Sequence, residues 1–403
     1  MSNVPKLRFK EFKDEWEEKK LKEIAIIISG STPPRSNYVY FKEGTIPWVK
    51  TMDLNNSIVN TTSEKITNKA VLDRNLKILP ENTLLIAMYG GFNQIGRTGI
   101  LNFEGTINQA ISALIPKDSM FNAAYLQQYL NLNVMKWRRF AASSRKDPNI
   151  TKKDVENFQV CLPSIEEQNK LSDFFVIINK KIQKQQEKIE LLKEQKKGYM
   201  QKIFNRELRF KDENSNEFPK WNKTRLDKIL TERKSYHIKS NEIPHATLST
   251  EGIYLKTERY DRDFLVRNQE KKYKISNLND ICYNPANLKF GVITRNQIGT
   301  VIFSPIYITF EIVDGYYPVF IEYMVIRKDF INKVRKYEEG TVYERMAVKP
   351  KDFLSLEVLI PCYEEQEKIG DFLKSFDNLI EKEVEYLELI KSQKKSFMQN
   401  MFV

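Results

Sequence analysis

Cysteine and long apolar runs are scarce in this chain of 403 residues. Its three cysteines, Cys161, Cys282 and Cys362, form no CxxC pair, which excludes both a disulfide scaffold and a zinc ribbon. No apolar run approaches the about 20 residues that a membrane helix needs. The first residues also lack the cationic and apolar regions of a secretory signal. We therefore expect a cytoplasmic protein without membrane contact.

The motifs of common catalytic sites are also missing. The two histidines, His237 and His245, do not have the HExxH spacing, and no GxxxxGK[ST] or GxGxxG is present. Residues 284–287 (NPAN) differ at the third and fourth positions from the Asn-Pro-Pro-aromatic motif of amino-methyltransferases. Acidic pairs such as Asp314 and Glu322 lack the trailing lysine of a metal-dependent nuclease. We expect no catalytic residue and no metal site.

Positive charge is in excess, with 65 Lys and Arg against 53 Asp and Glu, a net charge of +12. Such a surplus favours a polyanionic partner. It lies entirely outside residues 161–205 and 359–403, whose net charges of +3 and −3 cancel. Neither segment contains any of the 18 arginines, although arginine is the side chain that reads guanine and grips phosphate in a bidentate manner. The charge pattern therefore indicates that the remaining regions bind nucleic acid.

The chain is an internal duplication. Residues 161–204 and 359–402 are identical at 19 of 44 positions, at a constant offset of 198. The tripeptide LRF at 7–9 returns at 208–210, and the tetrapeptide NQIG at 93–96 returns at 296–299. Two copies predict pseudo-two-fold symmetry. We expect a first globular domain (1–160), a first long helix (161–205), a second globular domain (206–358, with a polar linker near 212–219) and a second long helix (359–403).

The two repeated segments carry a heptad pattern. Apolar residues alternate at spacings of three and four, which predicts a coiled-coil seam. Gln185 and Glu383 interrupt both copies near the middle, and with the opposite net charges they favour an antiparallel pair. The alternative is that each helix packs only on its own globular half. The predicted seam positions are Leu171, Phe175, Ile178, Ile182, Gln185, Ile189 and Leu192 in the first copy and Ile369, Leu373, Phe376, Ile380, Glu383, Leu387 and Ile390 in the second.

Each globular half combines short strands with helices, so the predicted fold class is α+β. Turn residues bound strands near 83–88, 99–103 and 111–115 in the first half. The second half has strands near 291–294, 300–303 and 306–312. Longer apolar patterns predict one helix over 123–140 and another over 320–337.

This organisation resembles the specificity (S) subunit of type I restriction–modification systems. The motifs are GSTP at 30–33, GTIPWV at 44–49, the triplet NQA at 108–110, LIP at 114–116, and LP…EEQ at 162–168 before the first long helix. The second half keeps IP at 243–244 and SP at 304–305 but lacks the following Trp and the NQA triplet. Different half-sites are therefore expected for the two halves.

The resemblance implies two target-recognition domains, each reading half of a split double-stranded DNA site. It also implies an antiparallel helix pair that sets the spacer and docks two methyltransferase (M) subunits, with motor–nuclease (R) subunits added to that core. S-adenosylmethionine, ATP and Mg would then be bound by the partner subunits, and this chain would be non-catalytic. The alternatives are a stand-alone DNA-modifying enzyme and a coiled-coil scaffold that binds only protein.

Candidate DNA-contacting residues lie mainly on glycine-flanked loops at 90–97 and 287–297. Asn and Gln match adenine edges, Arg matches guanine, and glycine lets the backbone approach DNA. Because NQIG occurs in both halves while the targets should differ, the tetrapeptide is also compatible with a structural turn. The candidates are Arg35, Asn37, Asn93, Gln94, Arg97, Arg145, Lys146, Asn287, Lys289, Arg295, Asn296, Gln297 and Arg345.

Overall fold

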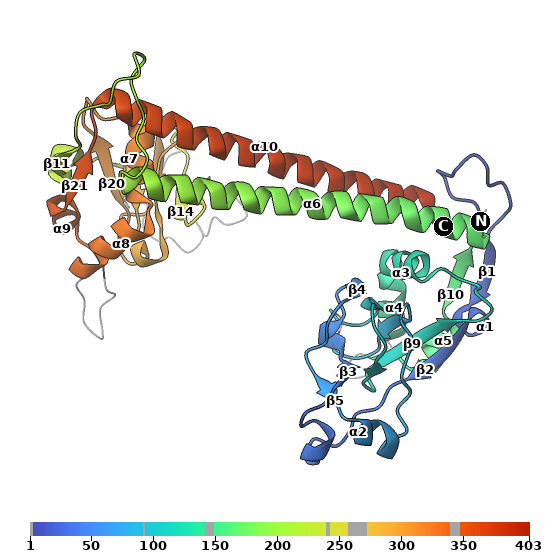
Figure 1. Cartoon of the computed structure of the whole chain (residues 1–403). Coiled ribbons are helices and arrows are strands. Elements are labelled where there is room, and N and C mark those ends of the chain that lie inside the picture. Colours follow the sequence, from blue (N-terminus) through green and yellow to red (C-terminus); the bar gives the residue numbers. More distant parts are fainter. Residues whose placement is uncertain (1–2, 92, 142–148, 239–241, 257–271, 339–346) are drawn as a thin grey trace. The chain divides into compact units, whose positions relative to one another are not determined.

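The fold is that of a computed structural model, which describes residues 3–91, 93–141, 149–238, 242–256, 272–338 and 347–403. The chain divides into two compact units, Met1–Gln186 with Glu385–Val403, and Glu187–Val384. Each unit contains a globular part with strands and short helices. Each also contains a stretch of the long helices α6 (Ile165–Phe204) and α10 (Tyr363–Met401) (Figure 1). The α+β prediction with two long helices is confirmed.

The first unit is built on a five-stranded sheet in the order β2-β9-β6-β7-β4. A smaller sheet has the order β5-β3-β8, and β1 pairs with β10 just before α6 begins. The strands are β1 (Glu17–Lys20), β2 (Ala25–Ser29), β3 (Ile46–Val49), β4 (Ser57–Val59), β5 (Lys65–Ile66), β6 (Leu84–Ala87), β7 (Thr98–Leu101), β8 (Thr106–Ile107), β9 (Ile111–Pro116) and β10 (Gln159–Leu162).

The second unit repeats this plan with a sheet in the order β12-β20-β17-β18. Here β11 pairs with β21 before α10, β13-β16-β19 form a second sheet, and β14 pairs with β15. The strands are β11 (Asn222–Arg225), β12 (Leu230–Glu232), β13 (Tyr236–Ile238), β14 (Ala246–Ser249), β15 (Gly252–Leu255), β16 (Lys272–Ser276), β17 (Ile281–Tyr283), β18 (Ile293–Arg295), β19 (Val301–Phe303), β20 (Ile308–Ile312) and β21 (Glu357–Ile360).

Short helices complete both globular parts. The single helices predicted over 123–140 and 320–337 are each broken, because Asn133 ends α3 and Arg327 leaves the helical region at ψ 141° before α8. The first unit has α1 (Leu21–Ile24), η1 (Tyr38–Tyr40), η2 (Thr51–Asp53), α2 (Asn68–Asp73), α3 (Ala123–Leu132), α4 (Val134–Ala141) and α5 (Lys152–Asn157). The second has η3 (Leu226–Lys228), η6 (Leu288–Phe290), α7 (Pro318–Val325), α8 (Lys328–Val334), η7 (Arg335–Tyr337) and α9 (Pro350–Ser355).

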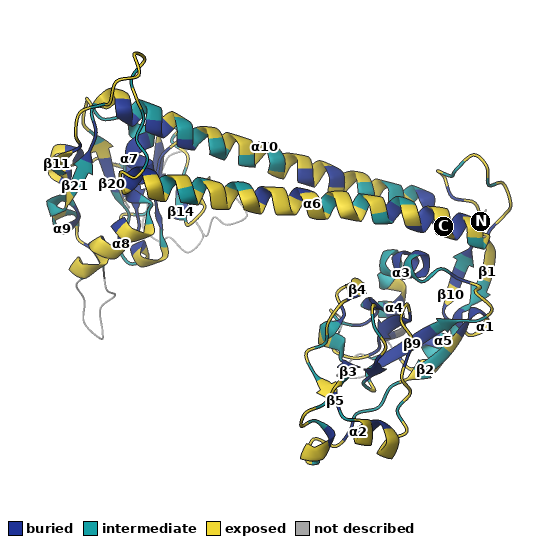
Figure 2. Cartoon of the chain, in the orientation of Figure 1, coloured by how far each residue is buried: buried dark blue, intermediate teal, exposed yellow. Residues whose placement is uncertain are grey.

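The helices α6 and α10 run antiparallel within each unit. In the first unit the rings of Phe174 and Phe397 lie 5.2 Å apart. In the second, Lys188 pairs with Glu383 at 2.6 Å, and Tyr199 contacts Phe372 with ring centroids 5.3 Å apart. Burial along both helices follows the predicted heptads, as the repeating dark and teal stripe in Figure 2 shows.

Each globular core incorporates the end of a long helix. In the first unit, Met401 and Phe402 are buried, and the Phe402 ring stacks on Tyr125 at 5.4 Å. In the second unit, Phe204 takes the corresponding place, with its ring 5.4 Å from that of Phe320. The helices therefore belong to the hydrophobic cores as well as to their own seam.

The segment after α6 is a closed turn. Asp212 accepts backbone hydrogen bonds from Asn214 and Asn216, which lower the pKa of its carboxyl group. Lys211 also bridges to Glu217 as an isolated antiparallel pair. The polar stretch near 212–219 thus has fixed local structure.

Candidate nucleic-acid interface

The repeated motifs at the start of each long helix join the helix to its globular part. Gln168 accepts the backbone N–H of Asn122, the N-cap residue of α3, and donates to the Pro163 carbonyl. Gln366 does the same in the second unit, where it accepts the backbone N–H of Tyr317 at the start of α7. These matched contacts place α3 and α7 at equivalent positions and provide an alignment of the two halves.

Two hairpin loops are equivalent between the halves. The sheet orders match β6 with β17 and β7 with β18, so the loop 88–97 corresponds to the loop 284–292. The prediction that NQIG belongs to the duplication is therefore wrong, because residues 93–96 precede β7 whereas residues 296–299 follow β18. The tetrapeptides therefore have different places in the fold.

The first hairpin loop presents part of its candidate set to solvent. Asn93 is exposed, and Gln94 is half-buried with its Nε2 3.8 Å from Met52 Sδ on η2. Arg97 donates to the Leu54 carbonyl at 3.3 Å, which fixes the loop against the segment after η2. Gly96 has a φ of 77° and lies against Trp137 of α4, so this position requires glycine.

Arg35 and Asn37 lie beside η1 in the first unit. The Arg35 guanidinium is 2.7 Å from Glu64 and 4.7 Å from the centroid of the Phe41 ring. That hydrogen bond is the main cause of the lowered pKa of Glu64. Asn37 caps η1 by accepting the Val39 backbone N–H. Arg35 is exposed yet oriented, a suitable arrangement for a contact residue.

The second hairpin loop also projects polar side chains. Asn287 and Lys289 are exposed, and Lys289 Nζ lies 5.3 Å from the centroid of the Phe290 ring. Phe290 itself is 66% exposed, and Gly291 completes the turn at a φ of 85°. Among the described residues of the first hairpin loop, Tyr89 is an exposed aromatic residue.

The candidates Arg295, Asn296 and Gln297 lie at the other end of β18. Arg295 is buried and binds Glu322 at 3.0 Å and the Asn279 side chain at 2.7 Å. Asn296 is fully buried and donates to the Ser276 hydroxyl and the Gly299 carbonyl. Gln297 is exposed and lies within hydrogen-bond distance of Glu322. The structure thus separates this group from Asn287 and Lys289.

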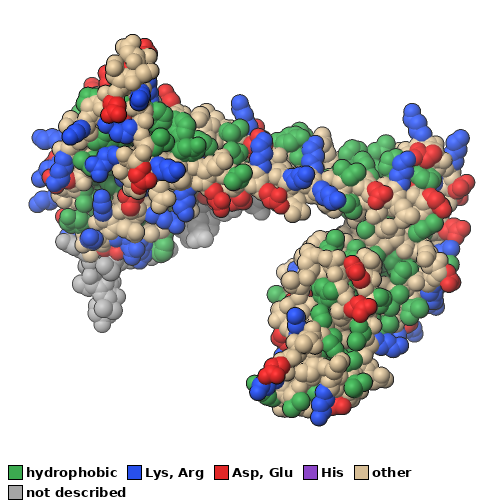
Figure 3. Space-filling view, viewed as in Figure 1, with side chains coloured by type: hydrophobic (Ala, Val, Ile, Leu, Met, Phe, Trp, Pro, Cys, Tyr) green, Lys and Arg blue, Asp and Glu red, His purple; other side chains and the backbone are tan. Residues whose placement is uncertain are grey.

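Three candidates, Arg145, Lys146 and Arg345, lie outside the described residues. The sequence reasoning did not identify Tyr89 and Phe290. The available signal was an aromatic residue next to glycine in two loops that the strand pattern makes equivalent. On the face in Figure 3, Lys and Arg side chains gather over the globular part of the second unit.

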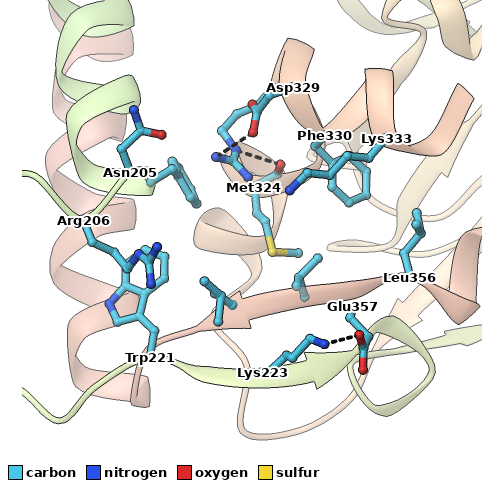
Figure 4. Close-up of a pocket in the computed structure, with 14 residues that line it drawn as sticks. Asn205, Arg206, Trp221, Lys223, Met324, Asp329, Phe330, Lys333, Leu356 and Glu357 are labelled. Atoms are coloured by element: carbon cyan, nitrogen blue, oxygen red, sulfur yellow. Dashed lines mark hydrogen bonds and ion pairs between the residues drawn. The ribbon is translucent and has the colours of Figure 1, made fainter. Parts of the chain in front are cut away.

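A pocket of about 450 Å³ opens where α6 ends in the second unit (Figure 4). Arg327 stacks 4.0 Å from the Phe204 ring centroid and pairs with Asp329 at 3.3 Å, while burial lowers its pKa. Lys223 at the lower edge of the view is bound to Glu357. Because Lys223 and Arg327 are paired within the chain and α6 ends at this pocket, we assign it to the junction between helix and domain.

The described residues contain no group of His, Cys, Asp and Glu that could hold a metal ion. None of the described helices is long and apolar enough to span a membrane.

Comparisons with known proteins agree on one family. Residues 13–194 match the type I restriction modification DNA specificity domain. The type I restriction enzyme EcoR124I/EcoR124II specificity subunit of Escherichia coli is 26% identical over 204 residues, or 49% of this chain and 50% of that protein. The chain thus aligns with about half the length of that relative.

Another relative aligns over most of the chain. The type I restriction enzyme MjaVIII specificity subunit of Methanocaldococcus jannaschii is 26% identical over 392 residues, covering 88% of this chain and 85% of that protein. The crystal structure of a type I restriction–modification system S subunit from M. genitalium has the same fold, with a TM-score of 0.57, 13% identity and 99% coverage of both chains. Residues 13–194 thus carry the type I restriction modification DNA specificity domain, and the chain as a whole is similar to type I restriction–modification specificity subunits.

Proposed function

We propose that this chain is the DNA sequence-specificity subunit of a type I restriction–modification complex. Each globular part reads one half of a bipartite site in double-stranded DNA, and the α6–α10 pair sets the unread spacer. The observation that carries the proposal is the pair of equivalent hairpin loops, 88–97 and 284–292, one in each duplicated half. Because their side chains differ, the two half-sites differ.

The contact set that we propose comprises the exposed or half-buried candidates other than Asn37, which caps η1, and Arg97, which binds the Leu54 carbonyl. Asn93, Gln94 and Arg35 serve the first half-site, and Asn287, Lys289 and Gln297 serve the second. Buried Arg295 and Asn296, together with Arg97, hold the neighbouring backbone in place. Tyr89 and Phe290 add exposed aromatic surface at the two loop tips.

The chain is non-catalytic in this proposal. Two methyltransferase subunits dock on it and bind S-adenosylmethionine, and motor–nuclease subunits bind ATP and Mg in the cytoplasm of the host cell. The family assignment supports this division of labour.

The test is to co-express the chain with the methyltransferase subunit of the same system in cells without other methylation. Sequencing that detects methyladenine should reveal one bipartite motif with a fixed spacer. A hybrid that carries residues 206–358 from another family member should change only one half of the motif. Methylation without a bipartite motif would contradict the proposal.

A further inference from the structure

A cleft in the first unit is lined by four lysines; Lys391 pairs with Glu388 at 2.7 Å, whereas Lys394 has no acidic partner among the described residues. It has a volume of about 1040 Å³ and lies between β4, α3 and the stretches of α6 and α10 in that unit. Lys180, Lys391, Lys394 and Lys395 line it, and the described lining residues include no Asp or Glu. Ten amide side chains, among them Asn179 and Gln128, also line the cleft.

The equivalent position in the second unit is closed by three side chains. Lys196 Nζ lies 2.5 Å from Asp377 and 4.8 Å from the centroid of the Tyr323 ring. The Tyr323 hydroxyl donates a hydrogen bond to the same carboxylate. Burial, then that hydrogen bond, raise the pKa of Tyr323. The lysine charge in this unit is therefore neutralised within the chain.

The duplication identifies the corresponding residues of the first unit. The offset of 198 matches Lys196 with Lys394 and Asp377 with Asn179. The matched N-caps, Asn122 and Tyr317, then match Tyr323 with Gln128. The first unit thus has an amide where the second has a carboxylate, and another amide where the second has a phenol.

These replacements leave polar groups without partners. Lys394 makes no ion pair or hydrogen bond with the described residues, and burial lowers its pKa. Gln128 is 8% exposed, and its Oε1 is buried without a hydrogen-bond donor among the described residues. Buried polar groups are normally paired because leaving them unpaired is unfavourable. Both side chains line the cleft, so both are available to an external group.

We propose that this cleft binds an acidic segment of the methyltransferase subunit, which supplies the carboxylate that Asn179 lacks. The inference rests on the proposed function and assigns one docking site within it. Ile58, Val176 and Met398 add apolar surface beside the lysines, as an amphipathic acidic peptide requires. A peptide also has N–H groups for Gln128, whereas a phosphodiester backbone presents only acceptors.

The test compares full-length variants by calorimetric titration with the purified methyltransferase subunit. The double substitution Lys394→Glu with Lys395→Glu should weaken one of the two binding events at least tenfold. Lys184→Glu is the control, because Lys184 is an exposed lysine of the same helix pair that does not line the cleft. The control should bind like the unmodified chain.

A second variant separates binding from folding. Asn179→Asp combined with Gln128→Tyr rebuilds the closed arrangement of the second unit, so it should weaken the same binding event without lowering the melting temperature. Unchanged affinity in both variants would overturn the proposal. The proposal would also be overturned if both variants kept their affinity for the methyltransferase subunit while their complexes bound DNA more weakly. In that case DNA, and not the methyltransferase, would occupy the cleft. If the unmodified chain binds no methyltransferase, the proposed function itself fails.

Discussion

Arg8 and Glu167 form a two-point ion pair between the segment before β1 and the first turn of α6. Arg8 Nε and Nη2 donate to the two carboxylate oxygens at 2.8 and 2.7 Å, and Glu167 is 1% exposed. Arg209 and Glu365 repeat the arrangement in the second unit, where Trp221 Nε1 donates a third hydrogen bond. The repeated LRF and EEQ motifs are thus two halves of one contact.

Glu365→Gln should destabilise the second unit by about 3 kcal/mol, because it leaves the Arg209 guanidinium partly buried without its counter-charge. Glu364→Gln is the matched control, since Glu364 is exposed in the same helical turn. Urea unfolding followed by tryptophan fluorescence measures the difference. Equal unfolding midpoints for the two variants would contradict a structural role for the pair.

Gly96→Ala should destabilise the first unit by about 2–3 kcal/mol. A Cβ atom there would lie 2.6 Å from Trp137 Cδ1, and the φ of 77° is unfavourable for alanine. Gly299→Ala has a similar φ of 97° but meets nothing within 4 Å, so we expect about 1 kcal/mol. Thermal unfolding of both variants measures which substitution is more destabilising. A larger loss of stability in Gly299→Ala would show that contact with Trp137 does not determine the cost at Gly96.

Glu64 should contribute a pH-dependent part of the stability. Its hydrogen bond with Arg35, followed by its contact with Lys50, holds the folded-state pKa below the ordinary 4.5. The stabilisation is therefore complete above about pH 4.5 and is lost as the pH falls through the folded-state pKa. Glu64→Gln should flatten this part of the stability profile below about pH 4.5. Parallel profiles for the two proteins would exclude the contribution.

Asn287→Ala should relax recognition of the second half-site only, at a cost of about 1–3 kcal/mol if Asn287 contacts a base. Lys289→Ala should instead weaken binding to all duplexes. It should also reduce by about one the slope of the logarithm of the binding constant against the logarithm of the salt concentration. Duplexes with single substitutions in either half-site, titrated with the assembled complex at several salt concentrations, distinguish the two. A defect confined to the first half-site would refute the assignment.

Inserting one heptad into both α6 and α10 at facing positions should lengthen each helix by about 10 Å and lengthen the unread spacer. The bases read should not change, because neither hairpin loop is altered. The methylated motif of the variant complex reports both quantities. An unchanged spacer would show that the helix pair does not set it.

The sequence predicts the regular parts of this molecule well. Heptad spacing along 171–192 and 369–390 locates the buried stripe, since a helix pair has one repeating contact geometry. The strands near 83–88 and 111–115 follow from local apolar patterns, and the structure has them as β6 and β9.

The candidate site was less predictable because exposure depends on tertiary partners. Nothing local distinguishes Arg295, which is bound to Glu322 across the fold, from exposed Lys289. The NQIG repeat was misleading for a related reason, since four identical letters do not specify which strand precedes them. Sheet topology, which the sequence reasoning did not establish, decides both cases.

The burial of Phe402 in the first domain determines when that domain can mature. Its ring packs against Tyr125 and Phe175, so the aromatic cluster requires a residue synthesised more than 200 positions after Phe175. At about 5–20 residues per second, translation imposes a delay of roughly 10–40 s. The domain synthesised first is therefore completed last. During that interval Tyr125 and Phe175 lack the Phe402 ring, and a chaperone would encounter their exposed aromatic surface on the nascent chain.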